Sequence, residues 1–140
     1  MRLMLPVDGT PAALKGVDHV IAVAGWYRDI PEIHLVNVQA ALPGDVTRFV
    51  RSDEVRSYHL EEGAKELAAA RSKLDAAGLR YVAHVDVGST AEMLARYARE
   101  HGIDLVVLGT RGLGSVAGML LGSVATKIVR ESPAPVMLVR

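Results

Sequence analysis

Residues 105–124 read LVVLGTRGLGSVAGMLLGSV, an apolar run followed by a glycine-rich loop and the start of a helix. The uninterrupted run Leu105–Leu108 predicts a strand buried on both faces, as in a parallel sheet. Gly109 follows at once, at a point where the backbone must turn sharply and where the lack of a side chain lets another group come close. The stretch therefore predicts one strand–loop–helix unit of an α/β fold.

The loop glycines follow the pattern Gly109-x2-Gly112-x9-Gly122-Ser123, and the segment VATKIVRES after them has helical character. A helix start has unpaired N–H groups and a partial positive charge, which together attract anions. The Ser123 hydroxyl can either cap this helix or donate a hydrogen bond to a phosphate oxygen. The loop is therefore predicted to hold a polyphosphate.

This glycine pattern differs from the general nucleotide-binding motifs. A Walker loop has a lysine directly after its second glycine, whereas Lys127 comes too late after Gly122. A dinucleotide fingerprint lies in the first strand–helix turn, whereas Gly112, Gly114 and Gly118 lie near the C-terminus with a different spacing. The pattern does resemble the nucleotide-binding signature of the universal stress protein family, and the resemblance extends from MLPVDGT to SPAPVMLVR.

Length and composition indicate a single domain, residues 1–140, with an aliphatic core, because 50% of the residues are hydrophobic but only 4% are aromatic. The 16 basic and 16 acidic side chains cancel, which argues against nucleic acid or a membrane as a partner. The sequence has no cysteine, no signal-peptide pattern and no apolar run of membrane-spanning length. These features predict a cytoplasmic location.

Strand and helix patterns alternate along the chain, which predicts a parallel sheet with right-handed crossovers. The family resemblance implies an open, twisted five-stranded sheet in the order 3-2-1-4-5 with helices on both faces. Such a fold is Rossmann-like and similar to that of the adenine nucleotide α-hydrolases. The predicted strands are Arg2–Val7, Glu32–Val38, Arg80–Val87, Leu105–Leu108 and Pro135–Val139, and the predicted helices begin at Thr10-Pro11, Glu54, Ser89-Thr90 and Gly122-Ser123.

Three further details of these elements are predicted. Residues 40–53 have no regular pattern and contain the breaker Pro43-Gly44-Asp45. Ser89 and Glu92 form a capping-box pattern at the start of a helix. The buried side of the helix over residues 54–77 is predicted to contain Leu60, Ala64, Leu67 and Leu74.

Asp8 and Gly109 follow the first and fourth strands, and parallel sheets bind ligands beyond the carboxyl ends of strands where the strand order reverses. A carboxylate at Asp8 suits ribose hydroxyls or a metal ion on the phosphates. The alternative is an Asp-Gly turn that caps the following helix. Nucleotide-binding members of the family have a Pro-x-Asp that lines the pocket at this point. Because Pro6-Val7-Asp8 matches it, the resemblance implies that these residues contact a nucleotide.

The resemblance also implies which other residues surround the nucleotide. A valine at the position of Val38, where the second strand ends, supplies main-chain hydrogen bonds to the adenine edge. Arg111 is the only fixed cation within the loop, and it either pairs with phosphate or stays solvated. The implied rim residues are Leu108, Gly109, Arg111 and Gly112, and the implied phosphate-binding residues are Gly122, Ser123 and Val124.

The loop departs from many relatives in one respect, because residues 113–121 contain no lysine or arginine. A bound Mg²⁺ ion would supply the missing positive charge, with Asp8 as its protein contact through the nucleotide. Alternatively, Met119-Leu120-Leu121 forms a lid or packs against a partner, and methionine and leucine favour packing. The five histidines show no metal-ligand spacing, so no metal site made of protein ligands alone is predicted.

The last strand, Pro135–Val139, is predicted to form an apolar edge of the open sheet, and proteins normally cover or pair such an edge. In a two-fold dimer, this strand would be covered by the same strand of a second copy. Members of the family commonly dimerise in this way, so we expect a homodimer. A helix that covers the edge is the alternative.

Two functional hypotheses follow from the sequence. In the first, the chain is an ATP-binding universal stress protein, with magnesium, that acts as a signalling or sensing module. The sequence offers no convincing catalytic base or water-orienting residue, so we expect binding with little or no hydrolysis. In the second, it is a nucleotide-free dimeric scaffold in which Gly122-Ser123 only caps a helix. An enzyme of the α-hydrolase class has little support, because the short chain lacks space for extra catalytic elements.

Overall fold

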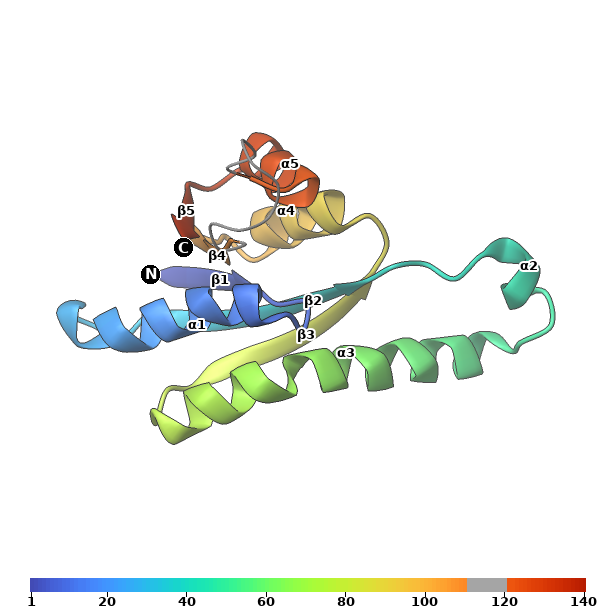
Figure 1. Cartoon of the computed structure of the whole chain (residues 1–140), viewed down its shortest axis with the longest axis horizontal. Coiled ribbons are helices and arrows are strands. Elements are labelled where there is room, and N and C mark those ends of the chain that lie inside the picture. The colour runs from blue at the N-terminus through green and yellow to red at the C-terminus, as the bar shows by residue number, and fades with distance from the viewer. Residues whose placement is uncertain (111–120) are drawn as a thin grey trace.

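The computed structural model describes residues 1–110 and 121–140 and contains a five-stranded sheet in the order β3-β2-β1-β4-β5. All neighbouring strands pair in parallel (Figure 1). The predicted α/β fold and the strand order implied by the resemblance are therefore confirmed. The strands are β1 (Arg2–Pro6), β2 (Glu32–Gln39), β3 (Tyr81–Val87), β4 (Leu105–Gly109) and β5 (Val136–Val139).

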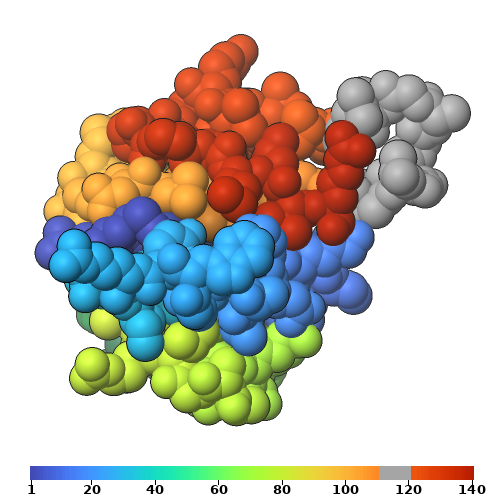
Figure 2. Space-filling model, turned by 90° about the vertical axis from the view of Figure 1, so that its left-hand side faces the viewer, coloured from blue at the N-terminus to red at the C-terminus, as the bar shows by residue number. Residues whose placement is uncertain are grey.

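Helices cover both faces of the sheet (Figure 1). One face carries α1 (Pro11–Val23) and α3 (Ser52–Ala76), and the other carries α4 (Thr90–Glu100) and α5 (Ser123–Glu131). Figure 2 shows this layering from one side, with α4 and α5 in orange and red above, α1 in blue, and α3 in green below. The two short elements are the 3-10 turn η1 (Ala24–Trp26) and α2 (Gly44–Thr47).

The central strand β1 contributes to a hydrophobic core on each side of the sheet. Its alternate residues Leu3 and Leu5 pack with α1 and α3, whereas Met4 packs with α4 and α5. Side chains of successive strand residues point to opposite faces, so a strand covered on both faces is apolar throughout. This is why the uninterrupted apolar runs in the sequence predict the sheet correctly.

The buried side of α3 differs from the predicted one. Leu67 and Leu74 are buried as predicted, but Ala64 is exposed and Leu60 is 49% exposed. The helix instead turns Gly63 toward β3, where an added Cβ would lie 2.5 Å from Cγ1 of Val85. The close approach of a glycine fixes which side of the helix faces the sheet, and the hydrophobicity pattern does not report this. The first turns of α3, together with α2, project beyond the sheet (Figure 1).

Helix starts agree with the sequence in position, but not always in their hydrogen bonds. The Thr10 hydroxyl accepts from the Ala13 N–H at 3.3 Å, and Pro11 is the first residue of α1, both as expected for an N-cap and its following proline. Ser89 occupies the N-cap of α4, but its side chain makes no capping hydrogen bond, so the predicted capping box is wrong in that respect. Among the described residues, no helix is both long enough and apolar enough to span a membrane.

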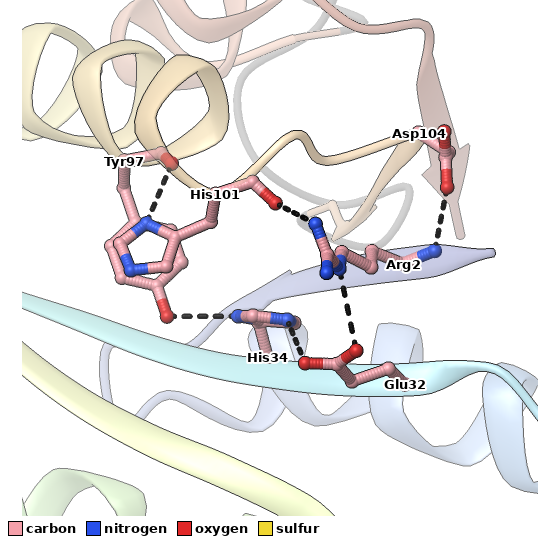
Figure 3. A network of polar contacts seen from close by, with 6 residues as sticks. All are labelled: Arg2, Glu32, His34, Tyr97, His101 and Asp104. Carbon is pink, nitrogen blue, oxygen red and sulfur yellow. Dashed lines mark hydrogen bonds and ion pairs between the residues drawn. The ribbon is translucent and has the colours of Figure 1, made fainter.

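A polar network joins β1, β2 and α4 at the amino ends of the strands (Figure 3). Arg2 lies 3.3 Å from Glu32 and also donates to the His101 carbonyl at 3.0 Å. His34 is buried, with Nδ1 2.9 Å from the Tyr97 hydroxyl and Nε2 3.1 Å from the Glu32 carboxylate. Burial lowers the pKa of His34, and the nearby Glu32 carboxylate offsets only part of this effect. His34 is therefore neutral at neutral pH, accepting from Tyr97 and donating to Glu32.

We expect the free energy of unfolding to decrease as the pH falls below 6.5, the ordinary pKa of histidine. Below that pH the unfolded chain protonates His34, whereas the folded protein resists protonation until its lowered pKa is reached. Stability from this source is thus complete above pH 6.5 and is lost below it. Urea unfolding between pH 7.5 and pH 5 measures the free energy of unfolding. This free energy should change less with pH in His34→Gln than in the wild type.

The control for this measurement is His19→Gln on α1, which lies outside the network and should keep the wild-type pH dependence. Glu32, Tyr97, His101 and Arg2 surround His34 and remain in both variants. If the free energy of unfolding changed equally with pH in His34→Gln and in the wild type, the prediction would be contradicted.

Candidate functional site

A pocket of about 340 Å³ opens at the carboxyl ends of β1, β2 and β4. The chain runs from β1 outward through β2 and β3 on one side, and from β4 to β5 on the other, so the strand order reverses between β1 and β4. Open parallel sheets usually bind ligands at such a point. The first turns of α1 and α5 and one side of α4 complete the wall.

Most of the predicted site residues line this single pocket, although they come from distant parts of the chain. Ser123 is not among the lining residues, and Arg111 and Gly112 lie outside the described residues, as do Met119 and Leu120. Which ligand the lining residues bind stays a prediction. The predicted residues in the lining are Pro6, Val7, Asp8, Val38, Leu108, Gly109, Gly122 and Val124.

Asp8 shapes the turn between β1 and α1. Its Oδ1 accepts from the Thr10 N–H at 3.0 Å and from the Thr10 hydroxyl at 2.6 Å. Gly9 between them has a φ of +80°, in the region that favours glycine. The Asp-Gly turn expected from the sequence is therefore present, but the residue that caps α1 is Thr10 and not Asp8. Oδ2 makes no hydrogen bond to any residue the structure describes, so this exposed carboxylate also has an oxygen to offer to a metal ion or a ribose hydroxyl.

Gly109 is required by the close approach of α1. The structure finds Gly109 inside β4, paired with Val139, and its φ is not positive, so the sharp turn considered from the sequence is absent there. An added Cβ would overlap the Ala12 carbonyl and lie 2.9 Å from the Ala13 carbonyl. On the helix side, a Cβ added to Gly16 would lie 3.1 Å from the Gly109 nitrogen. Two glycines thus let the start of α1 lie directly against β4 and form one wall of the pocket.

The start of α5 forms the opposite wall. Gly122, not Ser123, is the N-cap of this helix, and Ser123 is its first residue and is exposed. Gly122 has a φ of −68°, and no described atom lies within 4 Å of a Cβ added to it. Gly122 and Val124 line the pocket, so the first turn of α5, whose N–H groups have no partner within the helix, lies at the pocket wall.

The described part of the pocket wall is mostly apolar, with Asp8 as its one ionisable side chain. Within the described residues, no group of three or more acidic or histidine side chains is arranged to hold a metal ion. A metal ion at this site would therefore need further ligand atoms in addition to Asp8, such as the phosphate oxygens of a bound nucleotide. Apolar walls suit a flat base, and a helix start suits phosphate.

Sequence reasoning did not include Thr90 and Thr110 among the site residues, yet both line the pocket. Thr90 is the first residue of α4, and Thr110 directly follows β4, where its N–H and hydroxyl both donate to the Val139 carbonyl. Their positions just after strand ends, like that of Asp8, are the signal that identifies them.

Comparisons with known proteins identify the family and the fold. A model of the universal stress protein family matches residues 1–140. Universal stress protein G of Shigella flexneri is 33% identical over 145 residues, which cover 99% of this chain and 97% of the relative.

Two solved structures share the fold. A universal stress protein in complex with cAMP has a TM-score of 0.73 at 26% identity, covering 100% of this chain and 97% of that one. A universal stress protein family member from Arabidopsis thaliana with AMP bound has a TM-score of 0.69 at 16% identity, covering 99% of this chain and 90% of that one.

Proposed function

Because the chain belongs to the universal stress protein family, we propose that its pocket binds ATP or another adenine nucleotide together with Mg²⁺. Universal stress proteins take part in the stress response, and in this proposal the chain is a cytoplasmic signalling or sensing module with little or no ATP hydrolysis. The observation that carries the proposal is the convergence of Pro6-Val7-Asp8, Val38 and Gly122 on one pocket. The cAMP and AMP complexes of relatives support it.

The wall suggests how the nucleotide lies. Val38 and Leu94 offer an apolar surface for the base, and the first turn of α5 offers N–H groups for the phosphates. Asp8 has an oxygen available for a ribose hydroxyl or for Mg²⁺ on the phosphates. Among the described lining residues, Asp8 is the only ionisable side chain, and its role here is to hold the ribose or Mg²⁺ rather than to activate water, which fits binding with little or no hydrolysis.

The proposal is tested on the freshly purified protein. Mass spectrometry of small molecules released by denaturation should identify an adenine nucleotide. Calorimetric titration of the nucleotide-stripped protein with ATP and Mg²⁺ should show saturable binding, and the same solution should release little phosphate over hours. The proposal would be contradicted if the protein released no adenine nucleotide and the titration showed no binding of ATP.

We also propose a homodimer through β5. This strand pairs with β4 on one side only, and its Met137 and Leu138 are 37% and 38% exposed. An apolar strand at the edge of a sheet is a ready surface for a second copy. The same exposed edge favours the second candidate function, a nucleotide-free scaffold that acts through protein contacts.

Leu138→Arg should convert the dimer to a monomer in sedimentation equilibrium, because a charge in an apolar interface loses its hydration without gaining a partner. Val46→Arg is the control, since Val46 is also exposed, at 43%, but lies on α2. A wild-type protein that sediments as a monomer, or a Leu138→Arg variant that stays dimeric, would overturn the proposed interface.

A further inference from the structure

The pairing of β1 with β2 ends irregularly at the pocket. Its last main-chain hydrogen bond runs from the Val7 N–H to the Val36 carbonyl, at 2.9 Å. In a regular parallel ladder, the Val7 carbonyl would accept next from the Val38 N–H. It accepts instead from the side-chain amide of Asn37, at 2.8 Å, and no hydrogen bond joins the Val38 N–H to the Val7 carbonyl.

As a consequence, the main chain of Val38 faces the pocket. The Val36 carbonyl bonds to Val7, on the β1 side, whereas the Gln39 carbonyl bonds to the Gly88 N–H, on the β3 side. Main-chain groups alternate in direction along a strand, so the N–H and C=O of Val38 point to the β1 side, beyond the end of β1. Val38 lines the pocket there, and it presents a donor beside an acceptor.

Asn37 is held in one orientation from the opposite face of the sheet. Its side chain is fully buried, at 0% exposure, and its amide nitrogen also donates to Oε2 of Glu66 on α3, at 2.6 Å. Gln39 donates to the Asn37 side-chain oxygen at 2.8 Å and to the same Glu66 oxygen at 3.0 Å. Both N–H groups and the oxygen of the Asn37 side chain are therefore used.

We propose that Asn37 is a positioning residue for base recognition, because its side-chain amide takes the place of the Val38 N–H at the Val7 carbonyl and so leaves the main chain of Val38 available to the ligand. This inference rests on the proposed nucleotide binding and adds to it the residue that keeps the Val38 main chain free to select the base. Adenine offers N1 as an acceptor beside its 6-amino donor, which complements the Val38 N–H and C=O. Hypoxanthine reverses both groups, with an N1–H donor beside the O6 acceptor. Sites with fixed polar groups reject such a mismatch strongly, so ATP is preferred over inosine triphosphate.

The experiment compares calorimetric titrations of wild type and Asn37→Leu with ATP and with inosine triphosphate, each with Mg²⁺. Leucine has a similar size but no amide, so the Val7 carbonyl becomes available to the Val38 N–H. The preference for ATP should fall roughly tenfold, the usual effect of mispairing one base edge. Leu74→Val in the same α3 core, far along the helix, controls for lost stability and should keep the wild-type preference.

Amide hydrogen exchange at Val38 provides a readout that needs no nucleotide. The Val38 N–H should exchange fast in the nucleotide-free wild type and slowly in Asn37→Leu. A protected Val38 N–H in the nucleotide-free wild type would overturn the inference, even if Asn37→Leu did not fold. So would an unchanged ATP preference in folded Asn37→Leu, and both results leave the proposed function in place. A wild type that binds neither nucleotide would overturn the proposed function itself, and the base preference with it.

Discussion

Gly122→Val should weaken ATP binding by about a hundredfold or more while the protein stays folded. Gly122 lines the pocket as the N-cap of α5, so a valine there projects into the space through which phosphates reach the N–H groups of the helix. Loss of two charge-assisted hydrogen bonds accounts for an effect of this size. The fold should tolerate the change, because an added Cβ meets no described atom within 4 Å and a φ of −68° suits any residue.

Calorimetric titration with ATP and Mg²⁺ measures the affinity, and thermal unfolding checks the fold. The matched control is Gly44→Val at the start of α2, where an added Cβ also meets no described atom within 4 Å. This control should bind ATP like the wild type. Full ATP affinity in a folded Gly122→Val variant would show that the phosphates do not lie at the start of α5.

Gly109→Ala should lower the free energy of unfolding by about 1–3 kcal/mol, the usual range for forcing atoms into a packed core. The new methyl group would overlap the Ala12 carbonyl, so α1 would have to move away from β4. Backbone atoms of a helix cannot rotate aside as a flexible side chain can. The same displacement would widen the pocket, so ATP affinity should fall together with stability.

Urea unfolding at neutral pH measures this loss. Gly25→Ala in η1 is the control, because no described atom lies within 4 Å of a Cβ added there, and we expect it to change stability by less than about 0.5 kcal/mol. A Gly109→Ala variant as stable as the wild type would mean that the start of α1 can shift without cost.

The sheet and the pocket could be predicted from the sequence because their signals are local. Apolar runs such as Leu105–Leu108 indicate buried parallel strands wherever they occur. The Asp-Gly turn at Asp8 and the glycine at the start of α5 are likewise visible in short stretches. The strand order was implied by the family resemblance, and this order is what brings the ends of β1 and β4 together.

Features that depend on contacts between distant residues could not be predicted in this way. The buried side of α3 is set by Gly63 against Val85, and the need for glycine at Gly109 comes from carbonyls of α1. Asn37 looks like an ordinary polar residue within a strand, and only the structure joins it to Val7. In each case the deciding partner lies far away in the sequence, so the residue type alone does not identify it.

The composition of the pocket wall has a consequence for the growing polypeptide on the ribosome. The wall combines Pro6 near the first residues with Val38, Thr90 and Ile128, and β1 lies between β2 and β4. Residues as far along as Ile128 must have left the exit tunnel before the wall can close, although β1 and β2 have emerged long before. A ligand of this pocket therefore stabilises only late products of translation, and prematurely released chains gain no protection from it.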